Sequence, residues 1–334
     1  MAVQLSATDS GINPYGFLRI VLHPDGTLTR LDAYATVDDG TTEQNSAVLT
    51  KDITLDPTKK TWLRIFRPRQ LPPSFSSSSE KLPLVVYFHG GGFIVGGANW
   101  KMFHDLCVSM AVEFPALVVS VGYRLAPEHR LPTAYEDSVE ALHWIKNQAS
   151  SDGMNSEEWL RDLADFSRCF LVGTSAGGNI AFHVGLRALE VARELEPIKI
   201  TGLILHDPFF GASERTKSEL KLANDPILPL AATDLMWNLS LPKGFDRDHV
   251  YCNPMKLDPV ANQIGILGRC LVTGWSGDLL IDAQLEFIRL LEREGASVVP
   301  FLQEEGYHAQ EIFEPEKAPP LLKAIKDFIF NATL

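Results

Sequence analysis

The chain has 334 residues, of which 45% are hydrophobic and 22% charged, a composition that can bury a large core and excludes global disorder. Its 30 basic and 42 acidic residues give a formal net charge of −12, which repels a phosphate backbone and argues against a nucleic-acid binder. No uninterrupted run of about 18 apolar residues is present, so no membrane span is predicted.

Cysteine spacing and the N-terminal segment indicate the compartment. The four cysteines are spread along the chain without a C-x-x-C pair or a Cys/His spacing typical of zinc ligands. We therefore expect reduced, buried thiols and no metal site. Residues 1–17 lack a basic segment followed by an apolar one, so no secretory signal is predicted. These features predict a cytoplasmic protein, and nothing in them points to an obligate protein partner.

The N-terminal part of the chain is rich in strand patterns. Phe17–Leu22 and Thr27–Leu31 flank the turn sequence HPDG, which predicts a β-hairpin. Residues 62–66 alternate between apolar and polar as in a half-buried strand. Residues 71–82 are rich in Pro and Ser and predict a surface loop between strands, not a domain boundary.

From residue 84 onward the pattern changes to short apolar runs that alternate with amphipathic segments. Buried parallel strands separated by crossover helices give this alternation. The sequence therefore predicts an α/β fold with a central, mostly parallel sheet flanked by helices, formed by one domain over residues 1–334. The predicted strands are 84–88, 116–121, 169–172, 200–205, 270–272 and 297–301, and the predicted helices are 100–113, 135–148, 179–194, 280–294 and 319–330.

One stretch interrupts this alternation. Residues 207–260 lie between two predicted strands, are far longer than an ordinary strand-to-helix connection, and are rich in apolar and aromatic side chains. Such an insertion over the strand ends favours a cap that shapes a pocket. A flexible surface loop is the alternative.

The strongest chemical signal is the sequence Gly173-Thr174-Ser175-Ala176-Gly177, which follows a predicted strand and opens a predicted helix. In this context G-x-S-x-G is a nucleophile elbow, because the glycines permit a sharp turn that exposes the serine hydroxyl above the sheet. The alternative is a turn of small residues that only packs the helix on the sheet. A nucleophilic serine also needs an adjacent base, and the base needs an orienting carboxylate.

The base is sought among the histidines that follow Ser175. In this fold the acid and then the base follow the serine, each in a loop at the carboxyl end of a strand. His308 meets this requirement, since it lies in a loop after the predicted strand 297–301. His206 and His249 have no upstream acid in the required order. We therefore expect His308 to be the base.

Two carboxylates compete for the role of the orienting acid. Asp278 lies in the loop after the predicted strand 270–272, at a strand end. Asp282 lies in the first turn of the following helix, where an acid is expected simply to complement the helix dipole. Asp278 is the preferred candidate.

A tetrahedral intermediate needs hydrogen-bond donors for its oxyanion. The sequence His89-Gly90-Gly91-Gly92-Phe93 directly follows a predicted strand, and its glycines allow backbone N–H groups to point into the site. We expect the donors to be Gly91, Gly92 and Ala176, with His89 holding the loop. The loop lacks the G-x-G-x-x-G and G-K-[ST] spacings of nucleotide sites, so no cofactor is predicted.

These motifs resemble those of the plant carboxylesterases in the hormone-sensitive-lipase-like branch of the α/β-hydrolase superfamily. The resemblance is carried by HGGGF at 89–93, YRLAPE at 123–128 followed by Pro132, Ala134 and Asp137, GTSAGGN at 173–179, Asp278 and His308. It implies that Ser175, His308 and Asp278 are the nucleophile, base and orienting acid, and that Gly91, Gly92 and Ala176 bind the oxyanion. It also implies a cap formed by about residues 1–35 and 207–260.

The resemblance implies a serine carboxylesterase that hydrolyses small hydrophobic carboxylic esters through an acyl-enzyme, without a cofactor. Plant gibberellin receptors resemble these esterases but replace the catalytic histidine with an aliphatic residue, so the presence of His308 favours catalysis. Enzymes that resemble hydroxyisoflavanone dehydratases keep a similar set of residues and eliminate water. The sequence leaves that alternative open.

Overall fold

The computed structural model describes residues 11–31, 34–38, 46–71, 80–150, 156–258 and 263–331. Its main sheet contains β3 Val48–Asp56, β4 Thr61–Pro68, β5 Leu82–Phe88, β6 Leu117–Gly122, β7 Ala164–Thr174, β8 Ile200–His206, β9 Arg269–Trp275 and β10 Ser297–Gln303. These eight strands lie in the order β10-β9-β8-β7-β5-β6-β4-β3. β4 runs antiparallel to both of its neighbours, and the remaining pairs are parallel. The predicted mostly parallel sheet is confirmed.

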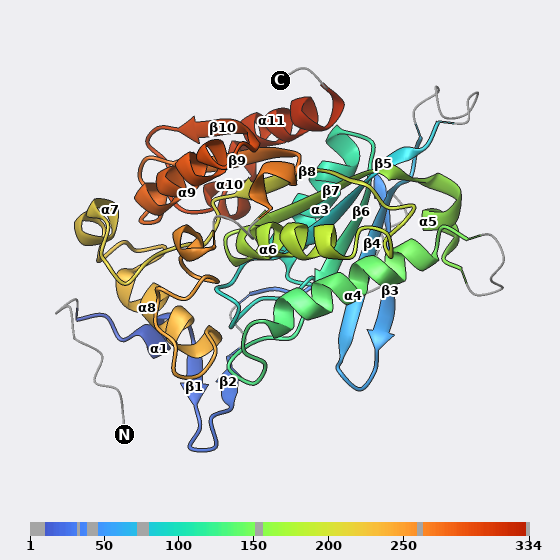
Figure 1. Cartoon of the computed structure of the whole chain (residues 1–334). Coiled ribbons are helices and arrows are strands. Elements are labelled where there is room, and N and C mark those ends of the chain that lie inside the picture. Colours follow the sequence, from blue (N-terminus) through green and yellow to red (C-terminus); the bar gives the residue numbers. More distant parts are fainter. Residues whose placement is uncertain are drawn as a thin grey trace.

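Helices cover both faces of this sheet (Figure 1). They are α1 Pro14–Phe17, α3 Lys101–Glu113, α4 Thr133–Asn147, α5 Glu158–Leu163, α6 Ala176–Glu190, α7 Lys217–Lys221, α8 Leu230–Ser240, α9 Ile281–Arg293, α10 Gln310–Phe313 and α11 Pro319–Phe330, with 3-10 turns η1 Pro254–Lys256, η2 Ile264–Ile266 and η3 Pro315–Lys317. Each strand and helix predicted from residue 84 onward overlaps one of the observed elements.

Side chains of the central strands divide between two apolar layers. In β5, Leu84 and Val86 belong to the core that includes α4, α6 and α9, whereas Val85 and Tyr87 belong to the core that includes α3 and α11. This division follows from the two-residue period of a strand. Because both faces are buried, β5 appears in the sequence as a continuous apolar run.

The predicted half-buried strand at 62–66 is in fact almost fully buried. Leu63, Arg64 and Ile65 are each at most 1% exposed, because β4 lies inside the sheet between β3 and β6. The charge of Arg64 is compensated there, since its Nε and Nη2 donate to the two carboxylate oxygens of Asp52 at 2.6 and 2.7 Å. An alternation of apolar and polar residues therefore does not by itself mean that one face of the strand is exposed to solvent.

The last strand shows the opposite deviation. The apolar run 297–301 predicts a buried strand, but β10 lies at the edge of the sheet and pairs only with β9. Ser297, Pro300 and Leu302 are exposed. Proline is tolerated at such a position because an edge strand has a free side that needs no N–H donor.

The predicted N-terminal hairpin is confirmed with shorter strands, β1 Ile20–Leu22 and β2 Leu28–Arg30, which pair antiparallel. The prediction that a strand begins at Phe17 is wrong, since Phe17 ends α1. Asn13 caps this short helix by accepting from the N–H groups of Tyr15 and Gly16, and Pro14 occupies its first position. Of the predicted loop at 71–82, residues 72–79 lie outside the described residues.

The insertion is folded over residues 207–258 and contains α7, α8 and η1. An ion-pair network holds it together: Arg247 donates to Asp234 at 2.6 Å and also to Glu219, and Arg215 donates to Asp234 at 2.5 Å. Figure 1 shows α8 next to α1, so the insertion meets the N-terminal segment at one end of the sheet. An irregular surface loop does not describe this segment.

Cys107, Cys169, Cys252 and Cys270 are buried free thiols, as predicted. Among the residues that the structure describes, no helix has both the length and the hydropathy needed to cross a membrane.

Phe287 packs in the core, with its ring centroid 4.9 Å from that of Phe182 and 4.4 Å from that of Phe210, so its replacement is a test of core packing. We expect Phe287→Ala to lower the free energy of unfolding by about 3–5 kcal/mol, since it removes a buried ring and leaves a cavity. Urea unfolding followed by circular dichroism measures this change. Leu220→Ala is the control, because Leu220 is 61% exposed, and its effect should stay within about 0.5 kcal/mol. Equal stability of the two variants would contradict the described packing.

Candidate active site

Ser175 lies in a sharp turn between β7 and α6. Its backbone has φ 56° and ψ −118°, in a region that non-glycine residues rarely adopt. The turn is possible because its neighbours are glycines: a Cβ on Gly173 would lie 2.0 Å from the carbonyl oxygen of Gly177, and a Cβ on Gly177 would lie 1.9 Å from that of Phe88. The N–H of Ser175 donates to the carbonyl of His206 at 2.8 Å. The predicted elbow geometry is therefore present.

Three side chains from separate loops form a chain of hydrogen bonds. Ser175 Oγ lies 2.9 Å from His308 Nε2, and His308 Nδ1 lies 2.8 Å from Asp278 Oδ2. Since a carboxylate only accepts, Nδ1 carries the proton and Nε2 accepts from the serine hydroxyl. The structure thus brings together the three residues that the sequence order predicts as nucleophile, base and acid.

Asp278 is buried and well supplied with donors. Besides His308, it accepts hydrogen bonds from the N–H of Leu280 at 2.9 Å and from Gln284 Nε2 at 3.0 Å. Asp282, the competing candidate, instead accepts from the N–H of Ser218 at 2.8 Å and ties α7 to α9. Gln284 was not predicted, because nothing in the sequence distinguishes it from any other polar residue of a helix.

The surroundings of His308 set its basicity. Burial alone would lower the pKa of His308, but the charge of Asp278 and the hydrogen bond to it outweigh burial and raise that pKa above its ordinary value of 6.5. The imidazole is therefore a stronger base than histidine in water, and it is held in the orientation that accepts from Ser175.

The glycine-rich loop lies beside Ser175 and lines the same cavity with Gly91 and Gly92. These glycines have φ +109° and +59°, and a Cβ on them would lie 2.0 Å from the Val95 carbonyl oxygen and 2.2 Å from Met236 Sδ. In the part of the chain that the structure describes, the N–H groups of Gly91, Gly92 and Ala176 donate to no protein acceptor. These N–H groups can therefore stabilise a negative charge beside Ser175. The Ala176 N–H lies at the N-terminus of α6, where the helix dipole contributes a partial positive charge.

Other residues of the sequence motifs support this loop. Burial lowers the pKa of His89 to about 4, so its imidazole is neutral. Its Nδ1 lies 2.8 Å from the Gly90 carbonyl oxygen, and its ring stacks on that of Tyr123 with centroids 4.2 Å apart. The Tyr123 hydroxyl donates to the His89 carbonyl at 2.8 Å. Arg124 pairs with Asp137 at 2.6 Å, which ties the segment after β6 to α4.

A cavity of about 340 Å³ opens over Ser175 and His308. Its walls are mostly apolar, and two segments of the chain contribute to them. The N-terminal segment contributes Phe17, Leu18, Leu31 and Tyr34, and the insertion contributes Phe209, Pro226, Ile227, Leu228 and Met236. No carboxylate is among the described residues that line it. Of its two arginines, Arg30 pairs with Glu128 at 2.7 Å.

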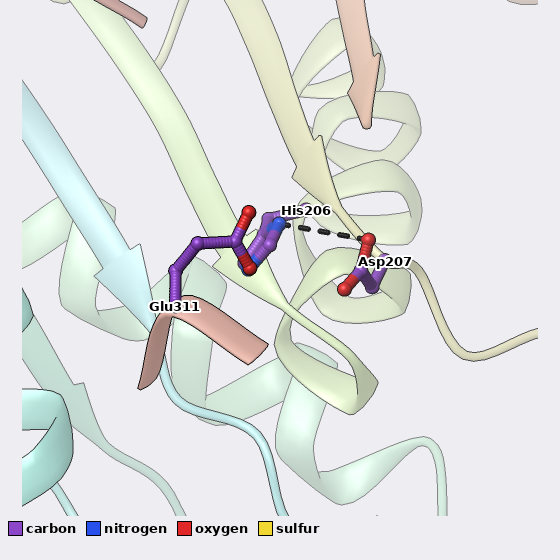
Figure 2. Close-up of side chains that lie close together, drawn as sticks. All are labelled: His206, Asp207 and Glu311. Carbon is purple, nitrogen blue, oxygen red and sulfur yellow. Dashed lines mark ion pairs between the residues drawn. The ribbon is translucent and has the colours of Figure 1, made fainter. Parts of the chain in front are cut away.

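A second group of buried polar residues lies behind the site. Figure 2 shows His206 and Asp207 at the end of β8, with Glu311 of α10 close to the imidazole. His206 Nδ1 is 3.7 Å from Asp207 Oδ1, and Nε2 is 3.5 Å from Glu311 Oε2. The two carboxylates thus face different nitrogens of one ring. One potential ligand atom each of His206, Asp207 and Glu311 lies within 4.8 Å of the others, and His206 Nδ1 also lies 2.7 Å from Thr273 Oγ1.

Comparison with known proteins places the chain among α/β hydrolases. Residues 85–311 match a family described by the α/β hydrolase fold. A 3-O-acetylpapaveroxine carboxylesterase of Papaver somniferum is 49% identical over 95% of this chain and 99% of its own length. An esterase structure from Pyrobaculum calidifontis superposes with a TM-score of 0.69 at 27% identity, over 84% of this chain and 82% of that one. A gibberellin receptor of Arabidopsis thaliana is 34% identical, over 85% and 80%.

The raised pKa of His308 is open to direct measurement by NMR titration of the histidine C–H resonances. We expect a midpoint above 6.5, and a lower midpoint in Asp278→Asn, where burial acts without the opposing charge. Because protonated His308 cannot accept from Ser175, any reaction that needs this base should fail as pH falls through the same midpoint. Asp282→Asn is the matched control and should leave the midpoint unchanged. An unchanged midpoint in Asp278→Asn would contradict the assigned cause.

Proposed function

The chain belongs to the plant carboxylesterases of the α/β hydrolase family, and on that premise we propose that it hydrolyses small hydrophobic carboxylic esters through an acyl-enzyme on Ser175. The observation that carries the proposal is the hydrogen-bond chain from Ser175 through His308 to Asp278, with distances of 2.9 and 2.8 Å.

In the proposed mechanism Ser175 Oγ attacks the ester carbonyl while His308 Nε2 takes the hydroxyl proton. The carboxylate of Asp278 holds the imidazole and stabilises the imidazolium that forms. His308 then returns the proton to the leaving alcohol, which leaves the acyl group on Ser175. A water molecule, deprotonated by the same imidazole, releases the acid.

The negative charge of each tetrahedral intermediate requires stabilisation by nearby donors. We assign this role to the N–H groups of Gly91, Gly92 and Ala176. Loss of one such donor in other serine hydrolases lowers turnover by about 10²–10³-fold. The unusual φ angles of the two glycines support this assignment, because they orient the peptide groups of the loop without a side chain in the way.

We further propose that residues 1–334 form one domain whose cap comes from about residues 1–35 and 207–260. Residues 1–10, 32–33 and 259–260 lie outside the described residues. The described parts of both segments line the cavity, and its apolar walls favour a hydrophobic ester over a peptide.

The presence of His308 within hydrogen-bond distance of Ser175 favours an enzyme over a receptor that only binds its ligand. The enzyme is expected to work in the cytoplasm without an obligate protein partner. Buried free thiols support a reducing compartment.

The role of Ser175 is tested with p-nitrophenyl acetate as substrate and an organophosphate as active-site titrant. Ser175→Ala should lower kcat by about 10⁵–10⁶-fold, because nucleophile and base act as a unit. The titrant should label one serine per wild-type chain and none in the variant. Ser213→Ala, at an exposed serine of the insertion, is the control. Substantial hydrolysis by Ser175→Ala would overturn the proposal. Ligand binding without hydrolysis by the wild type would instead favour the receptor alternative, and elimination of water the dehydratase alternative.

The size of the cavity predicts a preference for short acyl chains. A volume of about 340 Å³ is near the small end of ligand pockets. We expect kcat/KM for p-nitrophenyl acetate and butyrate to exceed that for the palmitate by at least about tenfold. Leu228→Trp should lower the butyrate-to-acetate ratio, because Leu228 lines the cavity from the insertion. Leu220→Trp, at an exposed position outside the lining, should leave the ratio unchanged.

A further inference from the structure

One buried carboxyl group near the site has no role in the mechanism above. Asp207 directly follows β8, is fully buried, and has φ 44°, in the left-handed region. Its Oδ2 accepts a hydrogen bond of 2.8 Å from the N–H of Ala309, the residue next to His308. Ala309 also lies in the left-handed region, with φ 54°. The backbone that carries the imidazole thus makes an unusual turn and is held from behind by Asp207.

Asp207 is close enough to the catalytic groups to affect them. One polar atom each of Asp207, Asp278 and His308 lie within 4.8 Å of one another. Two carboxylates this close together in a buried site cannot both be ionised without a large cost. One of the two acids is therefore expected to be uncharged.

The two acids differ in the number of hydrogen bonds that they accept. Asp278 accepts from His308, from Gln284 and from the N–H of Leu280, which favours its charged form. Asp207 accepts only from Ala309, and its Oδ1 has no hydrogen-bond partner among the described residues. Burial, together with the charge of Asp278, raises the pKa of Asp207 well above its ordinary value. Asp207 is therefore the carboxyl group of the pair that is favoured to be uncharged.

Resting on the proposed function, we propose that Asp207 is a positioning residue for ester hydrolysis: its uncharged carboxyl group holds the Ala309 N–H and so keeps the imidazole of His308 aligned between Ser175 and Asp278. An uncharged acceptor can hold this turn without competing with Asp278 for the proton on His308 Nδ1. Alignment matters, because a misplacement of about 1 Å at a reacting group can cost about 10² in rate.

Three further titratable groups act near Asp207 and His308. His206 faces Asp207 (Figure 2), and its Nδ1 lies 3.7 Å from Asp207 Oδ1. Glu311 lies beyond the imidazole of His206 and accepts from Trp275 Nε1 at 3.1 Å. A negative charge on Asp207, and to a smaller extent the charge of Asp225, would raise the pKa of His308, so the acid-side pH profile reports whether Asp207 is charged. Of these described groups, only Asp207 accepts a hydrogen bond from the backbone N–H of Ala309, the residue next to His308.

The proposal is tested by two substitutions at Asp207, with p-nitrophenyl butyrate as substrate. Asp207→Asn keeps an uncharged acceptor oxygen, whereas Asp207→Ala removes it. We expect Asp207→Asn to keep kcat within about threefold of wild type and Asp207→Ala to lower kcat by about 10²-fold, with KM within about threefold in both. If the Ala variant does not fold, Asp207→Leu removes the acceptor while filling the same volume. An Asn variant as impaired as the Ala or Leu variant, or an acceptor-free variant as active as wild type, would overturn the proposal.

The pH profile separates positioning from charge. Because Asp207 is proposed to be uncharged, the acid-side midpoint of kcat/KM should be the same in Asp207→Asn and wild type. A shift of that midpoint to lower pH would mean that a negative charge on Asp207 raises the pKa of His308, and it would overturn the proposal.

A readout that needs no turnover distinguishes this proposal from the proposed function. The proton on His308 Nδ1 should give a low-field NMR signal in wild type and Asp207→Asn, and the signal should broaden or vanish in Asp207→Ala. If Ser175→Ala is inactive but both Asp207 variants behave as wild type, only the role of Asp207 fails. If Ser175→Ala retains hydrolysis, the proposed function fails, and the NMR signal still decides whether Asp207 aligns His308.

Discussion

The strained turn at Ser175 is the constraint on which the site depends. A non-glycine residue with φ 56° and ψ −118° costs about 1–3 kcal/mol, so the surrounding structure has to hold it there. The N–H of Ser175 donates to His206 at the end of β8, and its carbonyl accepts from Phe209 at 3.0 Å, at the start of the insertion. The same turn therefore fixes the serine, the end of the neighbouring strand and the start of the insertion relative to one another.

The strand ends next to this turn supply the remaining polar groups. β8, β9 and β10 run parallel, so the segments that follow them meet at one edge of the sheet and bring Asp207, Asp278 and His308 together. Burial strengthens each interaction made there and penalises each group left unpaired. This explains why Asp278 has three donors, and it is the physical basis of the proposal that the neighbouring Asp207 is uncharged.

Arg30 is one of the residues that attach the N-terminal segment to this edge. Arg30 pairs with Glu128 at 2.7 Å and donates to the carbonyl oxygens of Ala126 and Ile94. Glu128 also accepts from the N–H of Leu28 at 2.9 Å. Glu128 ends the YRLAPE motif, so this motif residue holds the hairpin that lines the cavity. Residues far from the reaction thereby determine the shape of the pocket.

The sequence by itself determined the features that depend on neighbouring residues and on chain order. Glycines on both sides of Ser175 predicted the elbow, because only glycine fits that turn, and the order of serine, acid and base selected Asp278 and His308. The alternation of apolar runs and helices predicted the parallel sheet. These signals are local, and they can be read without knowing what each segment packs against.

Only the tertiary structure decided which segments meet. The burial of β4 and the exposure of β10 follow from their positions in the sheet, and the apolar patterns of these strands do not reveal those positions. Gln284 and Asp207 are ordinary polar residues in the sequence, and they gain significance through contacts with Asp278 and with the backbone of Ala309. Asp207 and Ala309 are 102 positions apart along the chain, so no local pattern relates them, and the fold alone brings them together.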